Sequence, residues 1–174
     1  SDTMSPAVHT RTVSDTAPCI DVICGPDEHD RMSLPKPERS YLKALDSLEV
    51  GRLKAWWSPD LGFAPVEPEV EAAAFAAART LAQAAGLELI DAPLRFTNTY
   101  PDWARLAGHR LRVRLEREGF YPARLEDLST GPRELVERYG HSTDLELAEA
   151  MDRIARLERE VGDFFQRADL LLTP

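Results

Sequence analysis

Residues 51–93 alternate between short apolar runs and one long helical pattern. Leu53–Trp57 and Leu87–Ile90 are apolar runs bounded by Gly, Ser or Pro, which favours strands over helices. Between them, Pro68 supplies a first helical position and Gly86 a helix stop. The order strand, helix, strand predicts a βαβ unit, and such crossovers are almost always right-handed.

The predicted helix from Pro68 to Gly86 carries apolar residues at helical spacing, and we expect this stripe to pack on the sheet. The stripe consists of Val70, Ala73, Ala77, Leu81 and Ala84.

Before this unit, a helical pattern runs from Val13 to Cys24, with Ser14 as its predicted cap. Residues 25–37 predict a loop rich in Pro and Asp. Tyr41–Leu48 predicts a short helix or turn.

After this unit, the pattern becomes helical. Thr99–Glu118 predicts one helix, and Leu125–Tyr139 predicts a short helix, a break at Gly131-Pro132, and a second helix.

The helical pattern is clearest from His141 to Arg167, where Thr143 and Glu146 form a capping box. The last apolar run, Leu170–Leu172, predicts a buried parallel strand. The predicted buried stripe of the long helix consists of Leu147, Met151, Ile154, Leu157, Val161, Phe164 and Phe165.

These elements predict the α/β class, with a small mixed or parallel sheet covered by several helices. Residues 1–174 would form a single domain or a partial domain. We expect at least one unpaired strand edge, which favours self-association into a homo-oligomer or aggregate.

The charge balance narrows the range of partners. The chain of 174 residues has 30 acidic and 21 basic side chains, a net charge of −9. This argues against nucleic acid and against an anionic membrane as the main partner. No apolar run reaches the ~20 residues of a membrane-spanning helix. Only Cys19 and Cys24 could form a disulfide, and their spacing on one helix disfavours it, so we expect a reducing, cytoplasmic setting.

No catalytic motif stands out from the residues themselves. The sequence has no phosphate-binding glycine loop, no GxSxG elbow and no HExxH. The cluster Asp27, Glu28, His29 and Asp30 could bind a cation through oxygen ligands, but a solvated loop is the better interpretation. We therefore predict no catalytic residue, no metal ligand and no cofactor in this chain, and leave the substrate-binding residues open.

Trp56 and Trp57 allow two interpretations. They could line a ligand pocket, because ligands of α/β sheets bind at the carboxyl ends of strands. One ring on each face of a half-buried strand is the simpler interpretation, and we favour it.

Four segments, taken together, resemble the amidase signature family of serine hydrolases. The start, from Asp2 to Asp15, is similar to that family's DTxGP…RTVxDAA segment. IDVICGPDEHDRMSLP, at residues 20–35, resembles LLxxLxGPDxxDPxSLP. GRLKAWWSPDLGFAPVEPEV, at residues 51–70, resembles GLRIxWSPDLGxxPVDPEV, and FFQRADLLLTP, at residues 164–174, resembles FxxxDLLLTPT. The segments follow the family's order and span nearly all of the chain.

The resemblance implies part of a larger α/β/α fold and an enzyme that hydrolyses carboxamides to a carboxylate plus ammonia or an amine. The family uses a nucleophilic Ser, a second Ser held by a cis peptide, and a Lys. This sequence has no Ser-Ser pair, and none of its three lysines matches the catalytic one. The resemblance thus places the triad before residue 1. The chain departs from the family at Ser5, where a Gly is usual.

Three hypotheses follow. The first is a segment of an amidase that acts on a small-molecule amide and is inactive alone. The second is a stand-alone, non-catalytic α/β binding or interaction module derived from such an enzyme. The third is a catalytically dead family member within a longer chain.

Overall fold

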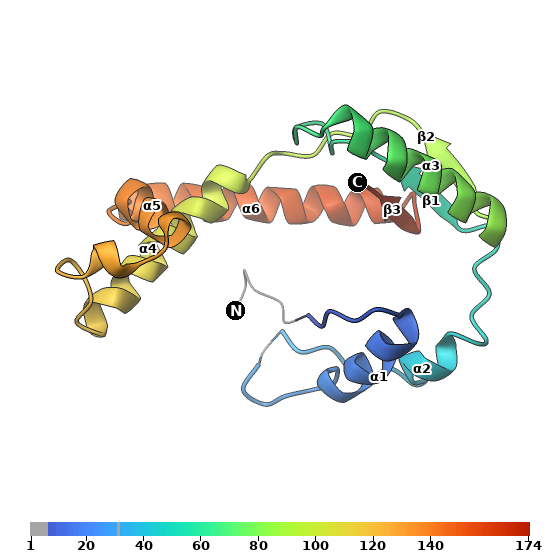
Figure 1. Ribbon diagram of the computed structural model, residues 1–174, viewed down its shortest axis with the longest axis horizontal. Helices are drawn as coiled ribbons and strands as arrows, with labels where there is room; N and C mark the ends of the chain where they lie inside the picture. Colours follow the sequence, from blue (N-terminus) through green and yellow to red (C-terminus); the bar gives the residue numbers. More distant parts are fainter. Residues whose placement is uncertain (1–6, 31) are drawn as a thin grey trace. The chain divides into compact units, whose positions relative to one another are not determined.

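The computed structural model of the protein describes residues 7–30 and 32–174 (Figure 1). The chain divides into two compact units, Ser1–Val50 and Gly51–Pro174, which we describe separately. The first family-like segment lies partly outside the described residues, and the departure at Ser5 lies wholly outside them.

The first unit contains two short helices, α1 (Val13–Ile23) and α2 (Tyr41–Ala44). The predicted cap of α1 was wrong. Thr12, not Ser14, has the extended backbone that a cap requires, and its hydroxyl oxygen accepts the Asp15 N–H.

The two helices of the first unit are joined by Asp21. Its carboxylate accepts the backbone N–H groups of Tyr41 at 2.7 Å and Leu42 at 3.3 Å. Of the described residues in this unit, only Ala17 is a buried apolar residue.

The second unit is built on a three-stranded sheet, as the sequence predicts. Its strands are β1 (Lys54–Trp57), β2 (Glu88–Asp91) and β3 (Leu170–Leu172). Their order is β2-β1-β3 and every pairing is parallel. Trp56 of the central strand is opposite Ile90 on one side and Leu171 on the other.

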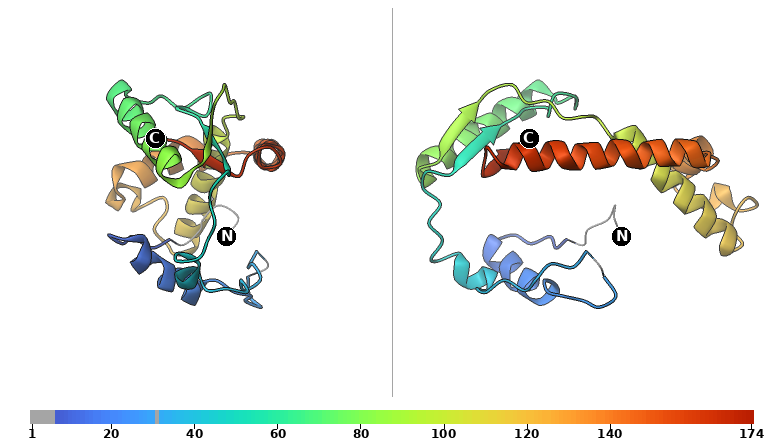
Figure 2. Two further views of the ribbon diagram at one scale, coloured as in Figure 1. Left: turned by 90° about the vertical axis from the view of Figure 1, so that its right-hand side faces the viewer. Right: turned by 180° about the vertical axis from the view of Figure 1, so that it is seen from behind.

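Helix α3 (Pro68–Ala85) covers one face of this sheet, and Gly86 ends it in the left-handed conformation, φ 68° (Figure 2). The predicted inner stripe was wrong. The residues buried on this helix are Ala78 and Ala82. The helix has alanines on two sides, so the spacing of apolar residues does not identify its inner face. The inner face is identified by Phe75, whose ring lies 5.2 Å from the ring of Trp57. All five residues of the predicted stripe are exposed.

Helix α6 (Asp144–Phe165) meets the opposite face of the sheet. Phe164, 0% exposed, places its ring edge-on to Trp56 with 5.8 Å between centroids. The preference for one tryptophan on each face is therefore confirmed. Trp56 also donates its indole N–H to the Ala92 carbonyl oxygen at 2.9 Å.

The predicted capping box of α6 is confirmed: Thr143 and Glu146 bond to each other's backbone N–H. The predicted buried stripe was wrong in part. Phe164 is buried, but Met151 and Phe165 are exposed, because only the last turns of α6 meet the sheet and the first turns meet α4.

Helices α4 (Tyr100–Arg117) and α5 (Thr130–Tyr139) pack on each other, and one 3₁₀ turn, Leu125–Asp127, precedes α5. The backbones approach closely at Gly108, where a Cβ would collide with the Leu135 carbonyl oxygen. The predicted break at Gly131-Pro132 was wrong. Both residues lie in the first turn of α5, where a proline removes no helical hydrogen bond.

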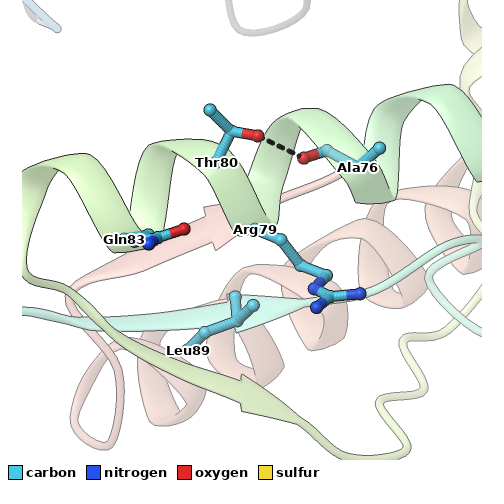
Figure 3. A pocket seen from close by; sticks show the side chains of 5 residues that line it. All are labelled: Ala76, Arg79, Thr80, Gln83 and Leu89. Carbon is cyan, nitrogen blue, oxygen red and sulfur yellow. Dashed lines mark hydrogen bonds between the residues drawn. The ribbon is translucent and has the colours of Figure 1, made fainter.

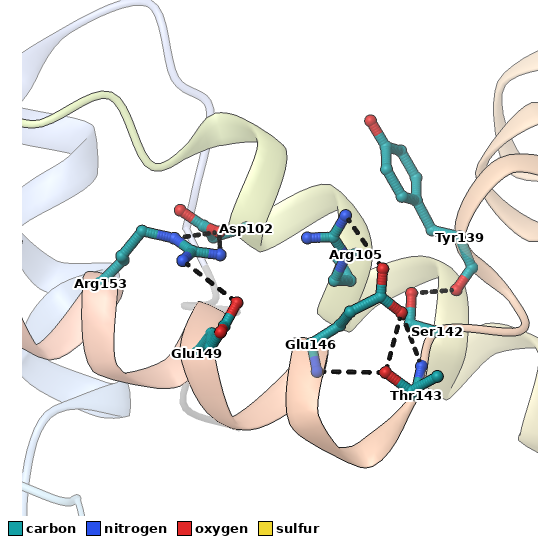
Figure 4. Close-up of polar contacts among 8 residues, drawn as sticks. All are labelled: Asp102, Arg105, Tyr139, Ser142, Thr143, Glu146, Glu149 and Arg153. Atoms are coloured by element: carbon teal, nitrogen blue, oxygen red, sulfur yellow. Dashed lines mark hydrogen bonds and ion pairs between the residues drawn. The ribbon is translucent and has the colours of Figure 1, made fainter.

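A buried ion pair fastens α4 to α6 (Figure 4). Asp102 is 4% exposed and accepts the Nε–H of Arg153 at 2.9 Å, with Nη2 at 2.8 Å. The hydrogen bond to Asp102 and its charge raise the pKa of Arg153. The start of α4 is thereby held against the middle of α6.

Candidate functional site

The three strands end at one edge of the sheet, and the segments that follow them define the candidate site. β1 ends at Trp57, β2 at Asp91 and β3 at Leu172. Ser58 N–H still donates to the Leu172 carbonyl oxygen at 3.0 Å, which keeps β1 and β3 in register beyond the last strand residue. Ligands of parallel α/β sheets bind at this edge.

After β1, residues 58–64 form a tight turn that its own side chains hold. Ser58, almost fully buried, accepts the Leu61 N–H on its hydroxyl oxygen at 3.0 Å. Asp60 accepts the Gly62 N–H on its carboxylate at 2.7 Å. Leu61 and Gly62 both have positive φ, 54° and 83°. A non-glycine residue in this region stores strain, which structures retain mostly at functional positions.

The turn lies directly on the segment that follows β2. Leu61 accepts the Phe96 N–H on its carbonyl oxygen at 3.0 Å. A Cβ on Gly62 would come within 2.7 Å of Arg95 Cγ and 2.8 Å of Arg95 Cα. Only glycine allows this approach, so the two segments form one continuous wall.

This wall borders a hollow of about 330 Å³. The hollow is lined by Trp57, Ser58, Pro59, Asp60, Gly62, Asp91, Ala92, Pro93, Leu94 and Arg95. Asp60, Asp91 and Arg95 are exposed and supply two carboxylates and one guanidinium. Such groups can bind and orient a polar ligand.

The hollow lacks the parts of a nucleophilic site among the residues that the structure describes. Ser58 is the only hydroxyl residue that lines it, and no Lys or His does. A serine becomes a strong nucleophile only with a neighbouring base. The arrangement can therefore position a ligand but does not by itself activate a nucleophile.

Glu160 of α6 anchors the segment after β2. Its carboxylate accepts Thr97 Oγ1–H at 2.6 Å and Thr97 N–H at 2.8 Å. These two hydrogen bonds, the side-chain bond first, lower the pKa of Glu160. Sequence reasoning missed this contact because the residues are 63 positions apart and neither lies in a motif.

The sequence-predicted candidate cluster at residues 27–30 lies in the first unit. Asp27 accepts the His29 N–H on its carboxylate, and Asp30 accepts the Met32 N–H, so both carboxylates close local turns. Across residues 7–30 and 32–174, no group of three or more His, Cys, Asp or Glu side chains could hold a metal ion.

A second hollow, of about 420 Å³, lies between α3 and β2 (Figure 3). Its polar residues are Arg79, Thr80 and Gln83, and Thr80 already donates its hydroxyl to the Ala76 carbonyl oxygen at 3.0 Å. This hollow has no reactive pair and no titratable cluster.

Several known proteins are similar to this chain in sequence or in fold, and their names agree with one another. Over 97% of its length, the chain is 31% identical to a Pseudomonas putida protein named amidase, of which it covers 36%. Over 61 residues it is 44% identical to an acylamidase of Rhodococcus erythropolis, covering 13% of it. It matches a bacterial aryl acylamidase, described as an amidase signature enzyme, with a TM-score of 0.76 at 24% identity over 95% of this chain and 35% of that one. Along nearly its whole length in sequence, and in its fold, the chain is similar to amidases and to an enzyme of the amidase signature family.

The family resemblance stated from the sequence is thus confirmed, as is the α/β fold class. The chain spans about a third of the length of the amidase it matches from end to end. No protein-family model matches it. Two of the family-like segments form β1 with the turn that follows it, and β3; β2 and the Arg95 segment lie outside them.

None of the helices in the described residues is both long and apolar enough to cross a membrane.

Proposed function

We propose that this chain is the supporting part of an amidase, which hydrolyses the C–N bond of a carboxamide to a carboxylate plus ammonia or an amine. The chain would contribute the sheet and one wall of the substrate cleft, and the Ser–Ser–Lys groups would come from polypeptide outside these 174 residues. One observation carries the proposal: the sheet of the second unit is open at β3.

Strand β3 pairs only with β1, so its other edge has no strand partner within the described structure. Parallel sheets normally have both faces covered and continue until an edge is protected. The three leucines of β3 are half-buried, which is unusual for a run of this kind. A further strand is expected on this edge.

Beside β3 lies an apolar hollow of about 480 Å³ that runs onto α3. It is lined by Trp57, Ala74, Ala77, Ala78, Leu81, Leu171, Leu172 and Thr173. Ala77 and Leu81 belong to the stripe that the sequence predicted to be buried. In the proposed amidase, the rest of the enzyme would cover that stripe. Helix α3 would then pack on the sheet with one side and on the rest of the enzyme with the other.

An open sheet does not suit a stand-alone binding module, so the amidase hypothesis is preferred. Two further expectations belong to the proposal. Cys19 and Cys24 are both free, which agrees with a reducing, cytoplasmic setting. The open β3 edge would also make the isolated chain self-associate, which light scattering at increasing concentration would detect as a growing particle mass.

A chimera tests the proposal. The segment of the Pseudomonas putida amidase that aligns with this chain would be replaced by residues 1–174, and amide hydrolysis by the chimera measured. We expect turnover, because the sheet and wall would be restored. A folded chimera without turnover would contradict the proposed role.

Variants of the chimera locate the wall. Gly62→Val should lower turnover strongly, because the side chain would push the Arg95 segment away. Gly119→Val, at a glycine that also has a positive φ of 73° but where an added Cβ meets nothing within 4 Å, is the matched control and should change turnover little.

A further inference from the structure

Helices α4 and α5 present aromatic and charged side chains together, at the end of α6 that lies away from the sheet (Figure 1). Tyr100 of α4 is 66% exposed and Trp103 is 38% exposed, and their rings lie 5.8 Å apart. Both rings line a shallow hollow whose α5 side includes Glu134 and Arg138. Tryptophan, tyrosine and arginine are the side chains most enriched where proteins bind one another, so this patch has the composition of an interaction surface.

The two charged residues of the patch lie on the outer side of α5. Glu134 and Arg138 are four residues apart, so they are neighbours on one side of the helix, and both are exposed. Val136, midway between them in sequence, is turned to the opposite side of the helix and is 1% exposed. The side of α5 that carries the two charges therefore faces away from the core of the second unit.

Glu134 and Arg138 do not pair with each other, although their spacing allows it. On the same helix, Arg133 and Glu137 have this spacing and lie 4.0 Å apart. The Arg138 guanidinium instead lies over the Tyr139 ring, 5.4 Å from its centroid. Within residues 7–30 and 32–174, neither Glu134 nor Arg138 has an oppositely charged partner, so both charges are available to a second molecule. The other helical pairs at this spacing are Arg112–Glu116, Arg114–Glu118 and Glu149–Arg153.

We propose that this patch binds a second copy of the chain, with the two α5 helices antiparallel about a two-fold axis. Antiparallel packing reverses the order of the charges, so Glu134 of each copy faces Arg138 of the other and two equivalent ion pairs form. Trp103 and Tyr100 border the same hollow, so the second copy also covers these rings and gains apolar contact. The proposal does not depend on amide hydrolysis. It also differs from association at the β3 edge, because a two-fold contact closes after two copies.

The test is charge reversal, with dimer formation by the 174-residue chain measured by sedimentation velocity at micromolar concentrations. Glu134→Arg and Arg138→Glu each place like charges opposite each other at both contacts. Each variant alone should therefore raise the dissociation constant of the dimer at least about tenfold. In an equimolar mixture of the two variants, opposite charges face each other again at both contacts. The mixture should dimerise with a dissociation constant within about threefold of the wild-type value.

The matched controls are Glu158→Arg and Arg159→Glu, which change the net charge equally at exposed positions of α6 outside the hollow. Alone or mixed, they should dimerise as the wild type does. Trp103→Ala should weaken the dimer about tenfold or more. Association at the β3 edge does not involve α5, so it would persist in every variant.

Three results would overturn the proposal. They are a monomeric wild type, α5 charge variants that associate as strongly as the wild type, and a mixture of the two α5 variants that stays as weakly associated as either variant alone.

Discussion

The two units of the chain differ in how much of their apolar surface they bury. In the second unit, residues from all three layers meet: Phe164 of α6, Trp56 and Trp57 of β1, and Ala78 of α3. In the first unit, Val22 is 85% exposed and only Ala17 is buried among the described apolar residues. Both units have well-capped helices.

This comparison shows that good local helix signals do not make a core. A cap contributes about 1 kcal/mol, whereas helices in proteins take most of their stability from packing an apolar face. Among its described residues, the first unit has the caps but buries only one apolar side chain. Its stability should therefore depend little on its own apolar side chains, and that of the second unit should depend on a few central ones.

The largest effect is expected from Phe164→Ala. This side chain touches Trp56, Phe96 and Phe165, and its loss should reduce the free energy of unfolding of the second unit by about 3–5 kcal/mol. Urea unfolding followed by tryptophan fluorescence measures the change. Phe165→Ala, at the exposed neighbour, should cost about 1 kcal/mol. Equal losses in the two variants would contradict this description of the core.

A smaller effect is expected from Gly62→Ala. An alanine at φ 83° costs about 1–2 kcal/mol, and its Cβ would also crowd the Arg95 backbone. The measurement is again urea unfolding, with Gly131→Ala as the matched substitution. A Gly62→Ala protein as stable as Gly131→Ala would show that the wall is not held by this contact.

The Glu160–Thr97 contact predicts a pH dependence in the second unit. Because the folded pKa of Glu160 is lowered, its contribution to stability is complete above the ordinary value of about 4.3 and is lost as the pH falls through the folded value. Glu160→Gln should therefore be less stable than the wild type at neutral pH, and the difference should shrink in acid. Glu158→Gln, on the same helix, is the control and should be as stable as the wild type at every pH. If the stability difference between Glu160→Gln and the wild type grew in acid, the assigned direction of the Glu160 pKa shift would be contradicted.

The smallest effect is expected in the first unit. Val22→Ser should change the free energy of unfolding by less than about 0.5 kcal/mol, since the side chain is exposed. Val136→Ala, at a buried valine of α5, should cost about 2 kcal/mol. If the two substitutions lowered the free energy of unfolding equally, the two units would not differ in how far they depend on buried apolar side chains.

The sequence predicted the strands of the second unit well. Gly and Pro flank the runs that form β1 and β2, and Asp169 and Pro174 flank the run that forms β3. It could not identify the inner face of α3. Alanines lie on two sides of that helix, and only the contact of Phe75 with Trp57, which are 18 positions apart, distinguishes the sides.

The candidate site was harder to predict. The SPDLG turn was visible in the sequence, but its role depends on Arg95 fitting against Gly62. The pairs Thr97–Glu160 and Asp102–Arg153 join positions far apart in the chain, and their residue types are common on protein surfaces. No local pattern marks them.

The most direct test of the central claim is the release of ammonia or amine from simple aliphatic and aryl amides by the purified 174-residue chain. The claim is that this polypeptide forms the sheet and wall of an amidase and takes its reactive groups from elsewhere. We predict no release above the protein-free blank. Sustained turnover that follows the protein concentration would contradict that claim.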